Sequence, residues 1–507
     1  MKQTLKELLI DREARLKNKT FIFWENDEVS YSKLLDTAKR IASSLAGKGL
    51  NQDDKVCIWL QNRPEFIYAM FGCAFSGTVL VPINTQFKQE EAQYIIDNSE
   101  ARLLITQPEF YEMAARIKAN CPKLKEIVVV DQAPSGTTPF SELYNPAKPV
   151  EREIVEDDIA GIIYTSGTTG FPKGAVLTHK NYLTNALQIA EAAKMTEADR
   201  FLCILPLFHV NGQLVTVLGP LYAGANMILT KGFSPKDFLA RLACYQATAF
   251  SGVPTVYAIL NSLPDAEQYD LSKLRFCICG AAPMPVEVFE TFERKYKAFI
   301  LEGYGLSEGT CASSINPLDG TRKIGSIGTP LKGQEMKIVD DKGQEVKSGV
   351  VGEIVVQGEN VMKEYYRNPQ ATEETLKGGW LHTGDLGYQD PDGYFFIVGR
   401  KKEMIIRGGE NIYPKEIEEV LYKHPGVLDA AVVGLPDKVW GEEVGAFIVP
   451  KPGQTMTEPE IIEYCKERIA KYKCPRQVFF RDTLPKTATG KIQKRKILDQ
   501  FLEGKNK

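Results

Sequence analysis

The amino-acid sequence predicts an α/β protein with a large N-terminal domain and a smaller α+β C-terminal domain. Three observations lead to this prediction. Short apolar runs alternate with helical patterns from residue 55 to residue 279, as in α/β units with parallel sheet. From about Ile324 the strands become shorter and are separated by Gly and Asp, which suggests an antiparallel sheet or a small barrel-like β subdomain. After Gly399 the pattern changes to a compact mixture of helices and strands.

The first α/β region alternates regularly between short apolar runs and helical segments. We expect strands at residues 55–60, 79–83 and 102–106, and helices at 65–75 and 89–98. A second series of expected strands follows at 200–205, 226–229, 247–251 and 275–279. This alternation predicts sheets covered by helices.

The second half of the chain predicts the connecting sheet and the small domain. Expected strands lie at 335–339, 352–357 and 393–399, followed by a helix at 414–424, strands at 429–434 and 443–449, and a helix at 458–471. About a hundred residues suffice for a small domain. We therefore expect an N-terminal domain at 1–399, a hinge at 400–402 and a C-terminal domain at 403–507.

The composition argues against several functional classes. The 507 residues are 43% hydrophobic and 25% charged, with a net charge of −3 and a pI near 6.0. Such a chain has no global basic field, so we expect no nucleic-acid partner. The basic run at 491–496 is expected to be a solvated face, and four histidines are too few for a His-rich metal site.

The chain shows no sign of export or membrane insertion. Its N-terminus mixes charges of both signs, and no run approaches the ~18 apolar residues of a membrane span. Ten cysteines are scattered without a disulfide framework, and Cys277 and Cys279 would share one buried strand face. We therefore expect a cytoplasmic protein with reduced thiols.

A phosphate-binding loop is the most informative motif. Residues 164–174 contain three glycines, four Ser or Thr hydroxyls and Lys173 directly after an apolar strand. Glycines let backbone N–H groups turn toward an anion, and hydroxyls and a lysine add further donors. The loop is not a Walker loop, because Lys173 precedes its glycine and Ala175 follows it. The sequence therefore indicates another kind of nucleotide site.

Five separated motifs occur in the order in which a known superfamily has them. They are residues 164–174, 303–308, 383–385, 399–411 and 485–491. With them the chain resembles the acyl-adenylate-forming superfamily over nearly its whole length. This superfamily includes acyl-CoA synthetases, adenylation domains of peptide synthetases and firefly luciferase. The resemblance implies ATP, Mg²⁺ and coenzyme A, and a small-molecule carboxylic acid as the substrate.

The implied chemistry explains why these residue types are needed. A carboxylate resists attack by a thiol, so it first attacks the α-phosphorus of ATP, which forms an acyl-adenylate and releases pyrophosphate. AMP is then a workable leaving group. Charge develops on phosphates, so catalysis depends on positioning and on electrostatic stabilisation.

The resemblance assigns the residues of the ATP site. Glu308 and Thr165 are expected to bind Mg²⁺ and to be catalytic, with Ser307 standing where many relatives have threonine. Tyr304 is expected to contact adenine, and Asp385 and Arg400 to bind the ribose. The remaining nucleotide residues are Ser166, Gly167, Thr168, Thr169, Gly170, Lys173, Gly280, Ala281, Ala282, Pro283, Glu302, Gly303 and Gly305.

The resemblance also assigns the second half of the reaction. Lys491 is expected to contact the acid carboxylate and the α-phosphate, and Lys402 to be the hinge about which a mobile C-terminal domain turns between the half-reactions. His209 is implied as an aromatic gate between acyl pocket and thiol channel, and its role as a base is left open. The expected residues on the CoA side are Gly408, Gly409, Glu410, Asn411, Trp440, Tyr472 and Lys473.

The identity of the substrate acid and one alternative enzyme class stay open. Phe208-His209 occupies the place where amino-acid-activating relatives carry aspartate, so an uncharged acid is favoured. Bacterial fatty acid–CoA ligases resemble the chain most, which predicts a medium- to long-chain fatty acid; 4-coumarate-type and carnitine- or crotonobetaine-type ligases are the alternatives. Residues 305–309 also fit the nucleophile elbow of an α/β-hydrolase, with His382 and His424 downstream. Peripheral membrane contact and a monomer or homodimer are both compatible with the sequence.

Overall fold

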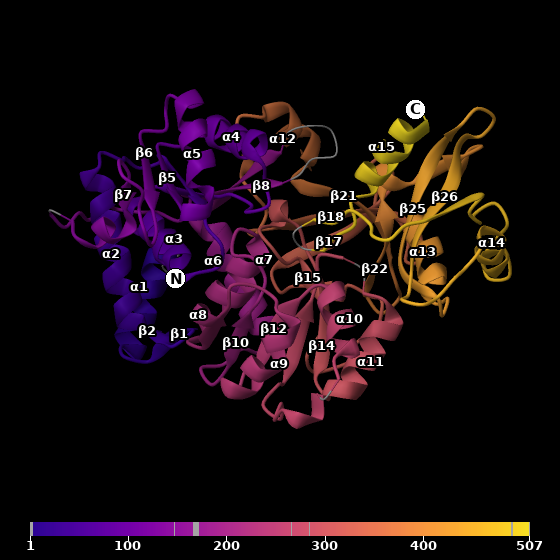
Figure 1. Cartoon of the computed structure of the whole chain (residues 1–507), viewed down its shortest axis with the longest axis horizontal. Helices are drawn as coiled ribbons and strands as arrows, with labels where there is room; N and C mark the ends of the chain where they lie inside the picture. The colour runs from indigo at the N-terminus through magenta and orange to yellow at the C-terminus, as the bar shows by residue number, and fades with distance from the viewer. Residues whose placement is uncertain are drawn as a thin grey trace.

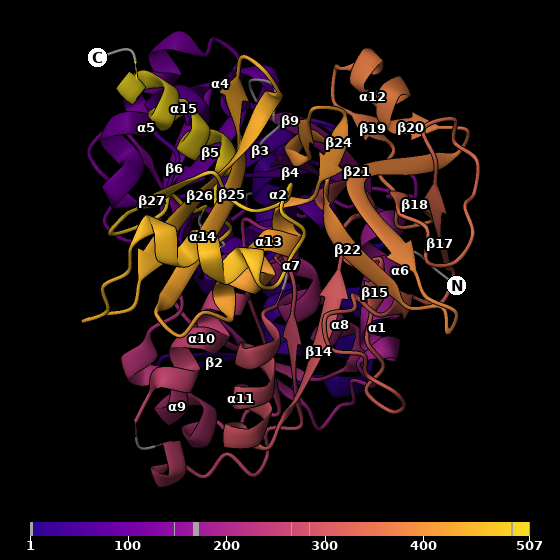
Figure 2. The same cartoon turned by 90° about the vertical axis from the view of Figure 1, so that its right-hand side faces the viewer.

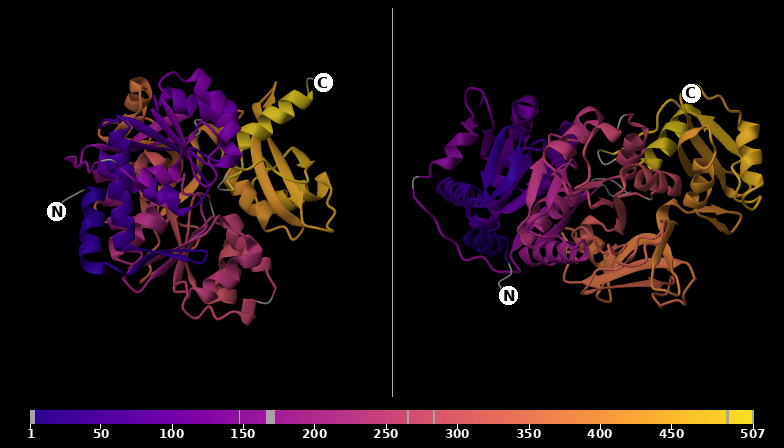
Figure 3. Two further views of the ribbon diagram at one scale, coloured as in Figure 1. Left: turned by 60° about the vertical axis from the view of Figure 1, so that its left-hand side comes forward. Right: turned by 90° about the horizontal axis from the view of Figure 1, so that it is seen from below.

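The computed structural model describes residues 4–146, 148–165, 172–264, 266–282, 284–487 and 490–505. Two large sheets with covering helices form the first part of the chain, and the small C-terminal part lies to one side of them (Figures 1 and 3). The predicted α/β class with a large N-terminal and a smaller C-terminal domain is confirmed.

The N-terminal sheet contains the first predicted series of strands. Its inner strands run parallel, and β9 joins β8 in an antiparallel hairpin at one side. In spatial order its strands are β19 (Glu364–Tyr365), β9 (Lys173–Thr178), β8 (Ile159–Thr165), β4 (Val79–Pro82), β3 (Lys55–Trp59), β5 (Leu103–Thr106), β6 (Glu126–Val129) and β7 (Thr138–Pro139). Its helices are α2 (Tyr31–Gly47), α3 (Pro64–Ser76), α4 (Gln89–Asn98) and α5 (Pro108–Asn120).

The central sheet contains the second predicted series, again mainly parallel. In spatial order its strands are β16 (Thr329–Pro330), β15 (Ser314–Ile315), β14 (Phe299–Tyr304), β13 (Phe276–Cys279), β12 (Ala249–Gly252), β10 (Arg200–Cys203), β11 (Asn226–Leu229), β1 (Thr20–Trp24) and β2 (Asp27–Ser30). Its helices are α1 (Leu5–Leu16), α6 (His179–Ala192), α7 (Val210–Gln213), the π-helix η2 (Leu214–Leu218), α8 (Gly219–Ala223), α9 (Pro235–Cys244), α10 (Pro254–Ser262) and α11 (Val286–Tyr296).

Local sequence signals explain where individual helices begin and end. Helix α3 starts with Pro64, whose fixed φ suits the first helical turn, and stops at Gly77, which adopts a φ of +70°. Helix α6 is held by a capping box in which Thr178 and Asn181 bond to each other's backbone. Pro64 and Gly77 explain why the observed bounds of α3 agree closely with the predicted helix at 65–75.

The largest buried cluster lies between the two large sheets. It joins Val56 and Ile58 of β3 with Phe201 of β10 and Met227 of β11, through helices α2, α3 and α6. Separate clusters cover the outer faces, one under α4 and α5 and the other under α9, α10 and α11. This packing fixes the two sheets relative to each other, so the carboxyl ends of their parallel strands can build one site.

A connecting antiparallel sheet follows, as predicted. It consists of β17 (Gln334–Val339), β18 (Gly352–Gly358), β21 (Trp380–Gln389), β20 (Leu376–Lys377) and β22 (Phe395–Arg400), with α12 (Pro369–Thr375) beside it. Strand β22 leads through the 3₁₀ turn η5 (Lys401–Glu403) into the last part of the chain. The predicted hinge at 400–402 therefore spans the end of a strand and a short turn.

The C-terminal sheet faces the viewer in Figure 2. Its strands are β24 (Glu410–Ile412), β23 (Ile405–Arg407), β26 (Gly441–Pro450), β25 (Val427–Asp437) and β27 (Gln477–Phe480), and its helices are α13 (Pro414–Tyr422), α14 (Glu458–Lys466) and α15 (Lys494–Lys505). Helix α14 is shorter than the predicted 458–471, because the N–H groups of Arg468 and Ile469 both bond to the carbonyl of Cys465 and turn the chain. Lys494 is not a solvated charge, since it pairs with Glu418 at 2.8 Å.

All ten cysteines are free, and each of them except Cys244 is buried. Cys277 and Cys279 lie on one face of β13 among apolar side chains, as expected of core thiols. None of the helices in the described ranges is long and apolar enough to cross a membrane.

Candidate active site

The two described ends of the predicted phosphate loop lie opposite each other. Thr165 ends β8 and Lys173 begins β9, and the two residues pair in the hairpin. Between them, Ser166, Gly167, Thr168, Thr169 and Gly170 lie outside the described residues. The hairpin places both ends of this loop at the carboxyl edge of the N-terminal sheet.

Glu308 lies beside Thr165 and is oriented by a tyrosine. The Thr165 hydroxyl is 3.3 Å from Glu308 Oε1, and the Tyr365 hydroxyl donates to the same oxygen at 2.7 Å. The Lys173 ammonium lies 5.2 Å from the centre of the Tyr365 ring. Two segments 143 residues apart in sequence thus place one carboxylate next to the phosphate loop.

This donor set fits Mg²⁺ better than a metal that needs a protein cage. Within the described residues, no group of three or more His, Cys, Asp or Glu side chains could hold a metal. Magnesium commonly takes one or two carboxylates and completes its shell with substrate phosphates and water. Both hydrogen bonds that the Glu308 carboxylate makes to described residues use Oε1, so Oε2 and the Thr165 hydroxyl would be the protein ligands.

The predicted nucleotide wall is formed by closely approaching backbone after β13 and β14. A Cβ on Gly305 would lie 1.6 Å from the carbonyl oxygen of Cys311, so only glycine fits there. A Cβ on Gly303 would lie 3.0 Å from the carbonyl oxygen of Ser314. Gly280 directly follows β13, and Ala281 adopts a φ of +69° and is exposed beside Ala282. Pro283 lies outside the described residues.

Glu302 is buried in this wall with an incomplete set of partners. Its Oε1 accepts a hydrogen bond from the backbone N–H of Met284 at 3.3 Å, whereas Oε2 has no partner among the described groups. Burial raises the pKa of Glu302 to about 7, and the charge of Lys415 on α13 acts in the opposite direction. Burial therefore favours the protonated form of Glu302, which lies on the strand face that also carries Tyr304.

Asp385 is the centre of a buried hydrogen-bonded group. It is 5% exposed. Its Oδ2 accepts from the Tyr304 hydroxyl at 2.6 Å, and its Oδ1 accepts from Arg400 Nε at 2.7 Å. Burial, followed by the charge of Asp385, raises the pKa of Tyr304 well above its usual range. The structure thus brings together all three residues that the sequence assigned to adenine and ribose.

Lys491 reaches the same group from the C-terminal part of the chain. Burial and the charge of Arg400 lower the pKa of Lys491, while Asp385 and Glu403 oppose that shift. Its loop is tight: the N–H of Gly490 donates to the carbonyl of Thr487 at 2.8 Å. A Cβ on Gly490 would lie 3.3 Å from Thr255 Oγ1 at the start of α10. The loop therefore rests directly on the large part of the molecule.

His209 lies between β10 of the central sheet and α7, directly before the helix. Its ring is 4.5 Å from that of Phe208, and its Nε2 is buried with no partner among the described groups. Burial lowers the pKa of His209 to about 4, so the ring is neutral at physiological pH. A neutral, unpaired imidazole suits a gate, and no described carboxylate orients it as a base.

Two family models match the chain. Residues 10–366 match the model of AMP-binding enzymes, and residues 416–491 match that of the AMP-binding enzyme C-terminal domain. The chain belongs to the AMP-binding enzyme family. The resemblance predicted from the separated motifs is confirmed.

Relatives of this AMP-binding enzyme are CoA ligases for chemically different acids. The chain is 34% identical to a long-chain-fatty-acid–CoA ligase of Bacillus subtilis, with 99% of this chain and 95% of that protein covered. It is 36% identical to a sulfoacetate–CoA ligase of Cupriavidus necator, covering 98% and 97%. The crystal structure of an anthranilate CoA ligase with anthranoyl-AMP superposes with a TM-score of 0.93 at 32% identity, covering 99% and 98%.

The class of reaction follows from these matches. This AMP-binding enzyme is an ATP-dependent acid–CoA ligase that forms an acyl-adenylate and transfers the acyl group to CoA, and Mg²⁺ is typical of its family. The three relatives differ in their acid at nearly equal identity, so identity alone does not choose the acid of this AMP-binding enzyme.

The residues predicted for the CoA side lie in the C-terminal part of the chain. Gly408 and Gly409 form the exposed turn between β23 and β24, with φ of +59° and +90°. A Cβ on Gly408 would lie 2.6 Å from the ring of Trp440, which is 46% exposed. Glu410 and Asn411 follow on exposed β24. Within the described residues, no hydrogen bond or ion pair joins these groups to the large part of this AMP-binding enzyme.

The remaining predicted residues have separate surroundings. Lys402 is exposed in η5, Tyr472 is 38% exposed, and Lys473 pairs with Glu416 at 2.7 Å. Ser307 begins the short turn η4 (Ser307–Gly309).

The rival hydrolase reading finds no support. In the described structure no hydrogen bond joins Ser307 to a histidine, because His382 lies beside Glu353 and His424 bonds to the backbone of Gly426.

Three residues that the structure places at the site were not predicted from the sequence. They are Tyr365 beside Glu308, Lys415 near Glu302, and Glu353 beneath the segment that carries Asp385. Each interacts with a residue of a distant segment, by a hydrogen bond or by its charge, so no local motif marked it. The only sequence signal is weak: Tyr365 belongs to an aromatic pair in a charged loop, and Glu353 follows a glycine at a predicted strand start.

Proposed function

We propose that this enzyme activates an uncharged aliphatic acid, a medium- to long-chain fatty acid, and transfers it to CoA. The observation that carries the proposal is the absence of charged side chains from the elements around His209. Residues 210–223, which form α7, η2 and α8, contain no charged side chain, and neither does β12. An acid with a second carboxylate or a sulfonate would need a buried cation there, since an unpaired buried charge costs several kcal/mol.

The polar atoms close to His209 also satisfy each other. The Ser251 hydroxyl donates to Oδ1 of Asn211 at 3.0 Å, so the pair is already bonded within the protein. Val210, Leu214 and Val215 around it are buried and apolar. An alkyl chain needs no hydrogen-bond partner and gains from such surroundings.

The site residues are proposed to act on the acid and on ATP in a defined order. An oxygen of the acid carboxylate attacks the α-phosphorus, the bond to the bridging oxygen breaks, and pyrophosphate leaves. Lys491 neutralises the carboxylate and α-phosphate as they approach, while Asp385 and Arg400 hold the ribose. Mg²⁺, when bound by Glu308 and Thr165, supplies positive charge to the phosphates.

The thiol step is proposed to need a second arrangement of the C-terminal domain. The sulfur of CoA attacks the carbonyl carbon of the acyl-adenylate, the thiol proton is lost, and AMP leaves with its oxygen. Lys491 is buried near Arg400, Asp385 and Glu403, whereas the Gly408–Gly409 turn is exposed. We therefore propose that residues 403–507 turn about Lys402 between the two half-reactions.

A pyrophosphate-release assay tests the choice of acid. Fatty acids of increasing length, 4-coumarate, anthranilate and sulfoacetate are compared with ATP, Mg²⁺ and CoA. We expect the highest kcat/KM with medium to long fatty acids. Turnover of another acid without any turnover of a fatty acid would reject the proposal.

The variant Asn211→Leu tests whether the enzyme binds an alkyl acid or an acid with a second polar group. It removes the only amide of this pair and keeps the side-chain size, so fatty-acid turnover should persist within a few-fold. An acid whose polar group depended on Asn211 would lose its turnover in the same variant. Ser251→Ala is the matched control, because it breaks the same bond and leaves the Asn211 amide in place.

A further inference from the structure

A bulge in strand β21 carries Asp385. The register places Val355 opposite His382 but Glu353 opposite Leu386, so β21 contains two more residues than β18 over this stretch. The extra length lies in Thr383, Gly384 and Asp385, and Gly384 adopts a φ of +70°. Bulges re-aim side chains next to active sites but remove ladder hydrogen bonds. The bulge therefore needs other partners to keep one conformation.

Glu353 supplies the main replacement partner. Its Oε1 accepts a hydrogen bond from the N–H of Gly384 at 3.0 Å, and its Oε2 lies 3.3 Å from Nδ1 of His382. The Thr383 hydroxyl donates to the carbonyl of Ile354 at 2.7 Å and accepts from the N–H of Asp385 at 3.1 Å. Every residue of the bulge is thus tied to β18 or to its own neighbour.

The same carboxylate is near the predicted hinge. Nζ of Lys401 lies 4.0 Å from Glu353 Oε2 and 2.7 Å from Asp341 Oδ1. Lys401 directly follows Arg400, which bonds to Asp385. Glu353 therefore contacts the bulge from one side and the chain entering the hinge from the other.

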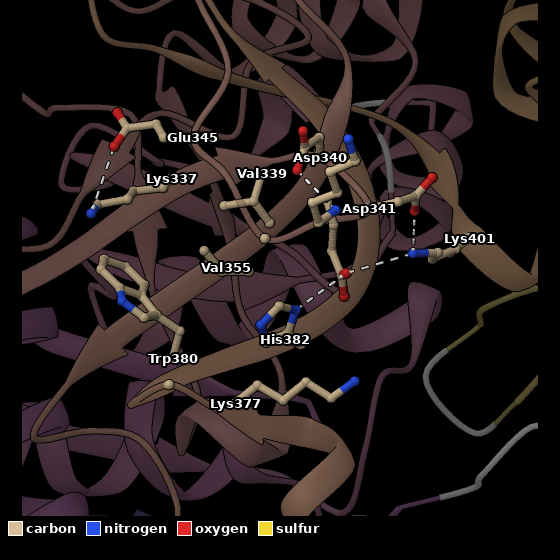
Figure 4. A pocket seen from close by; sticks show the side chains of 14 residues that line it. Lys337, Val339, Asp340, Asp341, Glu345, Val355, Lys377, Trp380, His382 and Lys401 are labelled. Atoms are coloured by element: carbon tan, nitrogen blue, oxygen red, sulfur yellow. Dashed lines mark hydrogen bonds and ion pairs between the residues drawn. The ribbon is translucent and has the colours of Figure 1, made fainter.

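These groups line a cavity of about 480 Å³ on the outer face of the connecting sheet. Figure 4 shows His382 and Lys401 pointing into it, with dashed lines marking their interactions. Asp385 does not line this cavity. The direct bond from Glu353 to the segment that carries Asp385 is the one to the backbone N–H of Gly384.

We propose that Glu353 is a positioning residue for ribose recognition: it fixes Gly384 so that Asp385 faces the sugar hydroxyls. The inference rests on the proposed function, in which Asp385 binds the ribose. The Glu353 side chain is 13% exposed, so its bond to Gly384 is shielded from water. Without this bond a glycine with positive φ has many other conformations, and Asp385 loses its fixed direction.

Binding of ATP and 3′-deoxyATP, measured by calorimetry without acid or CoA, tests the proposal. Wild type should prefer ATP, because Asp385 accepts from the sugar hydroxyls. Glu353→Ala and Glu353→Asp both remove the bond to Gly384, and each should lower the ratio of the two Kd values about tenfold, which corresponds to about 1.4 kcal/mol. Glu353→Gln keeps an acceptor oxygen and should hold the ratio within about twofold of wild type.

The matched control is Glu345→Ala. Glu345 lines the same cavity and pairs with Lys337 at 3.6 Å, but it does not contact the bulge. A lowered melting temperature with an unchanged Kd ratio in Glu353→Ala or Glu353→Asp would overturn the proposal. So would an equal change of the ratio in Glu345→Ala. If wild type itself does not distinguish the two nucleotides, the proposed role of Asp385 fails, and the inference fails with it.

Discussion

Replacing Tyr365 by Phe tests whether Glu308 is held in place for a metal. The Tyr365 hydroxyl donates to Glu308 Oε1 at 2.7 Å, and Tyr365 is 7% exposed, so water cannot simply replace the lost donor. A hydrogen bond to a charged group contributes about 1.5–3 kcal/mol. Glu308 keeps the Thr165 hydroxyl at 3.3 Å, so part of its orientation survives. We expect the lower end of that range.

In activity, such a loss corresponds to about a tenfold change. Partners that orient metal ligands typically change metal affinity or activity by 10–100-fold when removed. We therefore expect the Mg²⁺ concentration for half-maximal pyrophosphate release to rise about tenfold in Tyr365→Phe. KM for the acid should stay unchanged, because Glu308 does not contact the acid in the proposed mechanism.

Tyr366→Phe is the control for this experiment. Tyr366 is the next residue, its ring packs 5.1 Å from the Lys55 ammonium, and its hydroxyl makes no hydrogen bond to another described residue. The reasoning is refuted if Tyr365→Phe shows the Mg²⁺ dependence of wild type, or if Tyr366→Phe changes it equally. Circular dichroism and the melting temperature show whether either variant disturbs the fold.

Three further predictions concern the closing lysine, the nucleotide wall and acid stability. Lys491→Ala should suppress adenylate formation far more than CoA-dependent consumption of a supplied acyl-adenylate; equal loss in both assays contradicts the proposed alternation. Gly305→Ala should destabilise the protein by about 3 kcal/mol or more in urea unfolding, because its Cβ would lie 1.6 Å from the Cys311 carbonyl oxygen, whereas Gly47→Ala, with open space, should not. Burial lowers the pKa of His179 from 6.5 to about 4, so the unfolded chain takes up the proton first. The free energy of unfolding should fall by up to about 3 kcal/mol as pH drops from 6.5 to 4, and a His179→Asn variant with the same pH slope would contradict this assignment.

The sequence predicted the helices and strands whose signals lie in consecutive residues. Strands such as 226–229 and helices such as 89–98 agree with the observed bounds, because apolar runs, proline and glycine mark them locally. The end of α14 was predicted too late, since its last turn is decided by two N–H groups sharing the Cys465 carbonyl. The amino-acid composition of this segment does not show whether the chain continues as a helix or turns.

The site residues that belong to a sequence motif could be predicted. The structure brings Tyr304, Asp385, Arg400 and Lys491 into one electrostatic group, and their individual roles remain predictions. The supporting contacts were not predictable. Glu353 acts on a bulge 31 residues away, and a bulge arises from the register between strands, which no single strand sequence specifies.

The fold bears on the proposed rotation of residues 403–507. Lys401, one residue before Lys402, pairs with Asp341 in the turn that follows β17. Beyond Lys402, β23 pairs with both β24 and β26, and apolar clusters hold α13, α14 and α15 against that sheet. The Gly408–Gly409 turn and the Lys491 loop therefore belong to one packed unit. Any rotation that brings the turn to the acyl-adenylate must withdraw Lys491, so we expect that both cannot act on the substrate at once and that the two half-reactions are separated by the fold itself.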